Sequence, residues 1–145
     1  VLSPKKAPPN QAPKLNRSGL LPPHPRFDET PTNQVATCGL GESLGRHYAR
    51  LAADRNPIHQ YAWAARLFGL KRAIIHGMWT HAWALNKLSP KLNQPITKVK
   101  AWFLNPIYLP STILLKASFS GVGAIQARVL SEGAESDAML LEIET

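Results

Sequence analysis

The sequence contains a single cysteine, Cys38, and the lack of a second thiol excludes two kinds of site. No disulfide can form within the chain, and no cluster of thiolates can bind a metal. We expect Cys38 to be a small buried apolar residue on a strand. The histidines match no strong zinc signature either, so the sequence predicts no metal and no cofactor.

Long apolar runs are also missing. No uninterrupted apolar stretch is long enough to span a bilayer, and no charged-then-apolar signal segment opens the chain. We therefore expect a cytoplasmic protein with no membrane partner. The chain starts at Val1 and not at Met, which leaves room for a native N-terminus further upstream.

Acidic residues are scarce, with nine Asp and Glu against seventeen Lys and Arg, and the formal net charge is +8. Five of the nine acids follow Ser131, so Val1 to Ser131 holds every basic residue against four acids. A domain this basic suits an anionic ligand. Nucleic acid is one such partner, but no helix-turn-helix, finger or RNA-binding signature is present, so we expect no nucleic-acid partner.

Proline is concentrated near the start, where residues 1–33 hold eight of the thirteen. Proline removes backbone donors, and apolar residues are sparse in this segment, so it cannot offset its own ordering entropy. We expect residues 1–33 to form an extended arm, a linker or a disordered segment. Residues 34–145 then form one domain, which is large enough to bury a core.

The sequence of this domain predicts a strand, a short helix, two further helices and then four strands. The strand-like runs are 34–40, 96–104, 112–119, 124–130 and 138–143, and turns are expected at Gly121–Gly123 and Glu132–Asp137. A helix pair followed by an antiparallel meander indicates the α+β class.

The stretch Asp54-Arg55-Asn56-Pro57-Ile58-His59 carries the first functional signal. Asn56 is a strong N-cap and Pro57 suits the first helical position, so a helix should start here and run to Gly69. Its alanines predict a slim helix with a sheet close around it. Asp54 then lies on the incoming loop and His59 in the first turn, where the two side chains can converge.

The second signal is His76-Gly77-Met78, just before a helix expected over Trp79–Leu88. If this helix begins near Gly77, its first N–H groups are free and suit an oxygen that gains negative charge. The absence of a side chain at Gly77 leaves the approach open. The sequence therefore predicts a three-part site of Asp54, His59 and the Gly77 amide.

Taken together, D-x-N-P-[apolar]-H and I-x-H-G-M resemble the MaoC-like dehydratases and (R)-specific enoyl-CoA hydratases. The similar block runs from about Leu44 to Leu88, with a looser match over Phe103–Ile107 and Leu109–Ser111. The resemblance implies a hot-dog fold, in which a long antiparallel sheet wraps a central helix. It also implies reversible addition of water to a trans-2-enoyl thioester, whose anionic carrier is coenzyme A or an acyl carrier protein.

The resemblance also implies a role for each site residue. Asp54 and His59 hold and activate one water, and which of them removes its proton stays open. The Gly77 amide binds the thioester oxygen. We expect Asn56, His76 and Met78 to contact the substrate, with His76 chiefly shaping the turn. Relatives pair two hot dogs, which cover exposed sheet edges, so we expect a homodimer.

One departure from the family pattern keeps other functions open. The family usually has Ser or Thr, then Gly, before the aspartate, and this chain has Ala52-Ala53. The missing glycine would allow a positive φ that alanine disfavours. A non-catalytic hot-dog subunit or acyl-thioester binder is therefore an alternative, and so is a hot-dog thioesterase.

Overall fold

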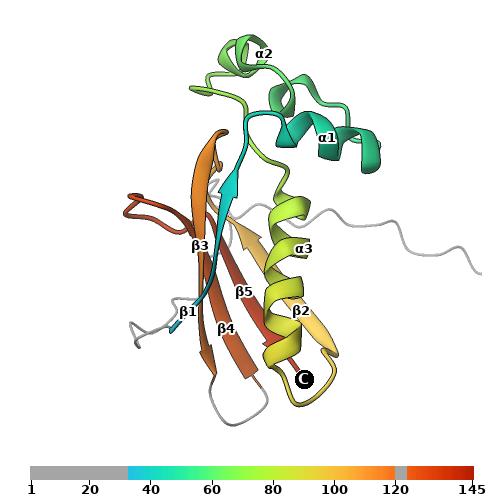
Figure 1. Ribbon diagram of the computed structural model, residues 1–145, viewed down its shortest axis with the longest axis vertical. Helices are drawn as coiled ribbons and strands as arrows, with labels where there is room; N and C mark the ends of the chain where they lie inside the picture. The colour runs from blue at the N-terminus through green and yellow to red at the C-terminus, as the bar shows by residue number, and fades with distance from the viewer. Residues whose placement is uncertain (1–32, 120–123) are drawn as a thin grey trace, which may run out of the picture.

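The computed structural model describes residues 33–119 and 124–145 (Figure 1). The predicted proline-rich arm and the predicted turn at Gly121–Gly123 lie outside these residues. The strands are β1 (Asn33–Leu40), β2 (Lys98–Phe103), β3 (Ser111–Phe119), β4 (Ala124–Ser131) and β5 (Met139–Glu144). The helices are α1 (Leu44–Leu51), α2 (Ala62–Leu67) and α3 (Gly77–Leu88), with short 3-10 turns η1 (Pro57–His59) and η2 (Ser89–Lys91).

All five strands form one antiparallel sheet in the order β1-β3-β4-β5-β2. Strands β3, β4 and β5 form the predicted meander, but the expectation that β2 belongs to it is wrong. Strand β1 already occupies the free side of β3, with Thr37 opposite Leu114. Strand β2 therefore pairs with β5 at the far edge, and the chain crosses the sheet to reach β3.

The core lies between the inner face of this sheet and α3. Alternate residues of each strand point inward, as the period of two along a strand requires. The fully buried residues of this layer include Ile113, Leu115, Ala117, Ala127, Val129, Leu141 and Ile143, together with Ala84 and Leu88 of α3. Figure 1 shows α3 along the inner face of the sheet. The α+β class and the hot-dog arrangement are thereby confirmed.

The helix that the sheet wraps is α3, and the prediction that the 57–69 segment takes this place is wrong. That segment splits into η1 and α2, because Tyr61 is extended (φ −135°, ψ 127°). In a continuous helix, the carbonyl of Ile58 would accept a hydrogen bond from the N–H four residues later. That carbonyl instead accepts from the N–H of Ile74 at 3.2 Å, so a tertiary contact ends the helix.

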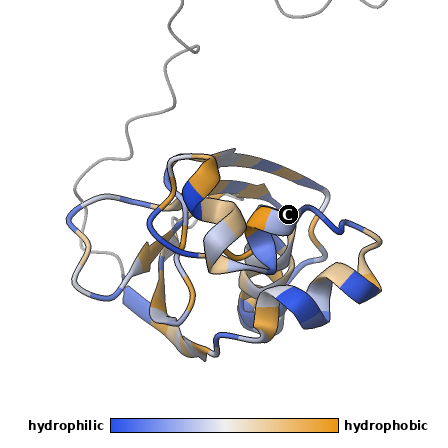
Figure 2. Ribbon diagram, turned by 90° about the horizontal axis from the view of Figure 1, so that it is seen from above, coloured by the Kyte–Doolittle hydropathy of each residue, from blue (hydrophilic) through white to orange (hydrophobic). Residues whose placement is uncertain are grey.

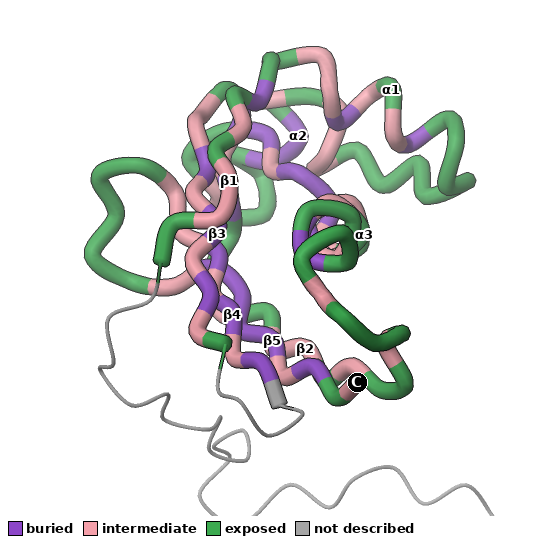
Figure 3. Tube along the Cα trace, turned by 60° about the horizontal axis from the view of Figure 1, so that its bottom comes forward, coloured by how far each residue is buried: buried purple, intermediate pink, exposed green. Residues whose placement is uncertain are grey.

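Residues 41–73 form what we call the helical lobe: α1, η1, α2 and the loops between them. The lobe sits at one end of the sheet and of α3 (Figure 1). Much of it is exposed, whereas β3, β4 and β5 are largely buried along one face (Figure 3). Among the described residues, no helix is both long and apolar enough to cross a membrane.

Candidate active site

The loop before η1 holds Asp54 through its neighbours. Asn56 caps η1 as predicted, and its side-chain oxygen accepts from the N–H of Ile58 at 3.3 Å. One carboxylate oxygen of Asp54 accepts from the N–H of Asn56 at 3.2 Å. The side chain of Asp54 is 54% exposed, so its second oxygen remains accessible to a ligand.

His59 ends η1 and is half-buried. Its Nδ1 lies 2.9 Å from the carbonyl oxygen of Ile74. A carbonyl can only accept, so Nδ1 carries the proton and Nε2 keeps a lone pair. Burial lowers the pKa of His59 below its usual 6.5, and His76 adds to this, although the Ile74 hydrogen bond and Asp54 act in the opposite direction. His59 is therefore a neutral base at neutral pH.

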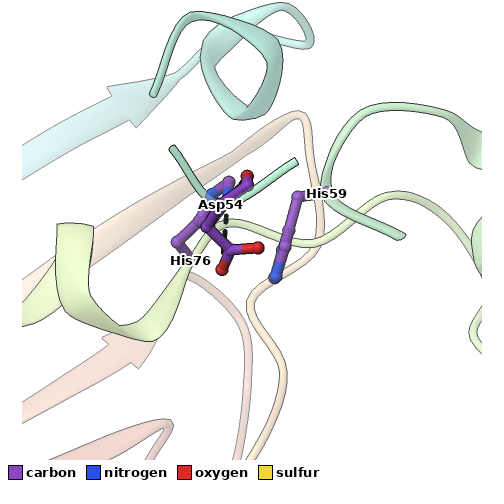
Figure 4. Close-up of side chains that lie close together, drawn as sticks. All are labelled: Asp54, His59 and His76. Carbon is purple, nitrogen blue, oxygen red and sulfur yellow. Dashed lines mark hydrogen bonds and ion pairs between the residues drawn. The ribbon is translucent and has the colours of Figure 1, made fainter. Parts of the chain in front are cut away.

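His76 is the most deeply buried of the three residues, with an exposed fraction of only 3%. Its ring stacks on His59 with centroids 3.7 Å apart, and Tyr48 packs against it edge-on at 4.9 Å. Its Nε2 lies 3.1 Å from the carbonyl oxygen of Asp54 and 3.8 Å from a carboxylate oxygen of the same residue. Figure 4 shows how Asp54, His59 and His76 converge. His76 thus links the aspartate loop to the start of α3.

Gly77 is the first residue of α3, so the helix expected over Trp79–Leu88 starts two residues earlier and meets the condition for a free amide at Gly77. Among the residues that the structure describes, its N–H has no acceptor, which is the ordinary condition of a first helical N–H. A Cβ at this position would lie 2.8 Å from the ring of Phe103. Glycine therefore keeps the amide open to a ligand oxygen that approaches beside Phe103.

Two cavities adjoin at His59 and Gly77, and both residues line each cavity. The outer cavity, about 400 Å³, is also lined by Tyr48, Ala52, Asp54, His76 and Met78. What we call the inner cavity, about 270 Å³, is mostly apolar: the buried Thr80 and Met139 form part of its wall, and the exposed Phe103 forms another part. A ligand with a polar head and an apolar tail can occupy both, with its junction at His59 and Gly77.

The structure brings together five of the six predicted site residues. Asp54, His59, His76, Gly77 and Met78 line the outer cavity. Asn56 lines neither of the two cavities, because its side chain is engaged in the cap. Its predicted contact with a substrate stays a prediction.

The lining residues that the sequence did not assign to the site include Tyr48, Thr80 and Phe103. Thr80 had a signal, since it lies one helical turn after Gly77 and so shares its face. Its hydroxyl is buried and lacks a hydrogen-bond partner within the described part of the chain. Tyr48 and Phe103 come from α1 and β2, and only the tertiary fold places them at the site.

Asp54, His59 and His76 are also the residues that could hold a metal, since each offers a ligand atom and these atoms lie within 4.8 Å of one another. A tetrahedral zinc ion with ligands at about 2.0–2.1 Å needs ligand atoms roughly 3.3 Å apart. The two imidazole rings also lie in nearly parallel planes, so their nitrogens do not point at a common metal position. The arrangement suits acid–base chemistry better than zinc, and the absence of a metal stays a prediction.

Comparison with known proteins agrees with the geometry. A family model described as "MaoC like domain" matches residues 24–138. The chain belongs to the MaoC-like domain family. Within this family, it is 33% identical over 99 residues to 3-hydroxyacyl-thioester dehydratase X of Mycobacterium tuberculosis, an alignment that covers 68% of this chain and 35% of that protein.

Solved structures show the same fold. The crystal structure of HtdX from Mycobacterium tuberculosis matches with a TM-score of 0.68 and 26% identity, over 76% of this chain and 46% of that one. The R-hydratase PhaJ1 from Pseudomonas aeruginosa matches with a TM-score of 0.65 over 78% of each chain, and its 21% identity bears on the fold alone. This MaoC-like chain spans about a third of the length of the curated relatives that it matches.

Proposed function

We propose that this MaoC-like chain catalyses the reversible addition of water to a trans-2-enoyl thioester. The observation that carries the proposal is the meeting of Asp54, His59 and the free Gly77 N–H at the junction of two cavities. The name of its relative, a 3-hydroxyacyl-thioester dehydratase, describes the reverse of this reaction and supports the same chemistry.

In this mechanism a water lies between the Asp54 carboxylate and Nε2 of His59. The fixed tautomer of His59 supports Nε2 as the acceptor of the water proton while the hydroxide adds to the β-carbon. The protonated His59 then gives this proton to the α-carbon, so that one water is added in all and His59 returns to its neutral form. Gly77 N–H donates to the thioester oxygen as enolate character develops, and a donor of this kind is typically worth about 10²–10³-fold in rate.

The inner cavity supports an apolar acyl chain as the tail of the substrate. Most of its lining is apolar, and a water-sized group occupies about 30 Å³. A cavity of about 270 Å³ therefore suits a short to medium chain. The head of the substrate is the thioester of coenzyme A or of an acyl carrier protein, and the carrier extends outward through the outer cavity.

A non-catalytic acyl-thioester binder is the second candidate, and one observation favours it. Ala53, directly before Asp54, has a φ of +56°, a conformation that alanine disfavours. Strain at this residue and the exposure of Asp54 are compatible with a site that binds without turning over. Ligand binding without hydration distinguishes this candidate, and release of free thiol distinguishes a thioesterase.

We also propose that the protein acts as a homodimer and without a nucleic-acid partner. The support for the dimer is the open sheet, whose two edge strands are β1 and β2. Its cytoplasmic location stays a prediction.

The test is the loss of enoyl-thioester absorbance with crotonyl-CoA. We expect hydration by the wild type, a loss of activity of about 10²-fold or more in Asp54→Asn and His59→Gln, and no release of thiol. Glu132→Gln is the matched control, because this exposed carboxylate directly follows β4 and lines neither of the two cavities. Equal activity in Asp54→Asn and the wild type would exclude the mechanism.

A further inference from the structure

The helical lobe, residues 41–73, carries most of the exposed large apolar side chains of the described residues. Five of the eight belong to it: Leu51, Tyr61, Trp63, Leu67 and Phe68. Trp63 (64% exposed) and Leu67 (76%) are four residues apart on α2 and so share one face, while Ala64 and Ala65 bury the opposite face. Exposed apolar side chains gathered on one short segment indicate a contact surface.

The same lobe concentrates positive charge. It holds six basic residues against Glu42 and Asp54, a formal net charge of +4. Five of the six basic residues are arginines, at positions 46, 50, 55, 66 and 72, and the sixth is Lys71. Figure 2, which looks down on this end of the molecule, shows apolar and hydrophilic segments side by side.

These cations have no carboxylate partners among residues 33–119 and 124–145. The ion pairs of lysine and arginine there are Lys98–Glu144, Lys100–Glu142 and Arg128–Asp137, all on the sheet and its loops. The acids near the end of the chain thus neutralise the sheet and leave the lobe positive. Charge complementarity therefore calls for an acidic partner on the lobe.

The arginines and aromatics of the lobe meet around one hollow. The lining of a cavity of about 350 Å³ includes three arginines, one acid and two aromatic residues: Arg46, Arg66, Arg72, Glu42, Tyr61 and Trp63. The two aromatic rings stack with centroids 6.1 Å apart. Arginine and aromatic residues are enriched at protein interfaces, where lysine is depleted. This composition favours a protein partner.

The other occupants fit less well. A second copy of this chain would bring two positive lobes together, which like-charge repulsion disfavours. Membrane-surface helices carry a strongly charged face opposite the apolar one, whereas the face of α2 opposite Trp63 and Leu67 consists of the buried Ala64 and Ala65. The phosphates of a coenzyme A molecule would leave Leu51, Leu67 and Phe68 without a contact.

The lobe also borders the mouth of the active site. Gln60 and Tyr61 directly follow His59, and Asp54 itself belongs to the lobe. On these grounds we propose that the lobe docks an acidic acyl carrier protein and presents its thioester to the outer cavity. This inference rests on the proposed function and names the carrier of its substrate.

The experiment compares crotonyl-CoA with a crotonyl-loaded bacterial acyl carrier protein as substrates. In the double variant Arg66→Gln/Arg72→Gln we expect kcat/KM for the carrier-bound substrate to fall at least about tenfold, because two unpaired interface cations are lost. Crotonyl-CoA turnover stays within about twofold of the wild type. Lys87→Gln/Lys91→Gln, which removes the same charge from exposed lysines at the far end of α3 and in η2, leaves both substrates unchanged.

A second variant tests the apolar part of the surface. Leu67→Ser keeps the charge and selectively weakens carrier-protein turnover. An equal loss on both substrates, or no loss on the carrier-bound one, would overturn the docking proposal. Tighter lobe-dependent binding to phosphatidylglycerol vesicles or to single-stranded DNA than to the carrier protein would also overturn it.

Calorimetric titration with the carrier protein separates docking from catalysis. Binding by the wild type and not by Arg66→Gln/Arg72→Gln supports the lobe even if crotonyl-CoA is not hydrated, an outcome that would refute only the proposed reaction. Hydration of crotonyl-CoA with no carrier-protein binding would refute only the docking site.

Discussion

Ala53 occupies a left-handed conformation, with φ +56°, in the loop that delivers Asp54. An alanine in this region costs roughly 1–2 kcal/mol, and glycine avoids this at the expense of about 0.5–1 kcal/mol of chain entropy. Ala53→Gly should therefore raise the free energy of unfolding by about 0.5–1 kcal/mol. Urea denaturation measures this change.

Ala52 is the matched control, because it directly precedes Ala53 and has an ordinary φ of −86°. Ala52→Gly should lower the free energy of unfolding by about 0.5–1 kcal/mol, since only the entropy cost applies. If both substitutions change stability in the same direction, strain at Ala53 is not the reason. The sequence pointed to this position, but only the structure shows the angle.

The titration of His59 gives a second prediction. Burial lowers its pKa below 6.5, so the neutral base persists as the pH falls under that value. The acid limb of kcat/KM for crotonyl-CoA should lie below pH 6.5 and shift upward only when His59 becomes more exposed. A pH profile from 4.5 to 8, roughly, covers both the free and the protonated forms.

The same shift affects stability with a definite sign. Below pH 6.5 the unfolded chain takes up a proton at this site before the folded chain does, so stability is lost as the pH falls. His59→Gln should reduce this loss. An acid limb at or above pH 6.5 would contradict the assignment of His59 as the base.

At the level of secondary-structure elements, α3 was predictable and α2 was not. The His76-Gly77-Met78 break marks the start of α3, which begins at Gly77, two residues before the expected Trp79, and ends at Leu88 as expected. The segment after Pro57 has helical periodicity, yet it divides at Tyr61. The guanidinium of Arg46 donates to the carbonyl of Gln60 and the N–H of Ile74 to that of Ile58, and neither long-range contact is visible in local propensity.

Gly77→Ala tests the start of α3. The new methyl would meet the Phe103 ring at 2.8 Å, and Phe103 is 51% exposed and can swing aside. Alanine is the better helix former by about 1 kcal/mol, so Tm should not fall. The methyl and the displaced ring fill the approach to the amide, so kcat/KM for crotonyl-CoA should fall on the order of 10²-fold.

Gly41→Ala is the control for this substitution, because a Cβ there has no neighbour within 4 Å among the residues that the structure describes. It should change neither Tm nor kcat/KM. A fall of several degrees in Tm for Gly77→Ala would mean that the residue serves packing and not the approach of a ligand.

For the whole molecule, the strand segments could be predicted from the sequence but their order could not. Alternation identifies β2, where Val99 and Ala101 pack toward the core and Lys98 and Lys100 are exposed. Nothing local to β2 indicates that it pairs with β5, because sheet order depends on contacts between distant segments. For the same reason Phe103 at the end of β2 was not expected beside Gly77.

This strand order bears on the oligomer, because it leaves β1 and β2 as the two edges. An irregularity in β1 between Gln34 and Ala36 disturbs that edge, as bulges commonly do on edges that stay unpaired. Strand β2 has a regular register over its whole length, and its lysines are neutralised by Glu142 and Glu144. The β2 edge is thus better suited to pair with its own copy.

We therefore predict a two-fold dimer through β2, with a light-scattering mass of twice 16.0 kDa. Amide exchange in Lys98–Phe103 should slow as the protein concentration rises, since pairing protects edge N–H groups, while exchange in Asn33–Leu40 stays constant. Dimerisation across β2 also brings two inner cavities close together, because Phe103 ends β2 and lines that cavity. A mass of 16.0 kDa at all concentrations, or protection of the β1 edge instead, would rule this arrangement out.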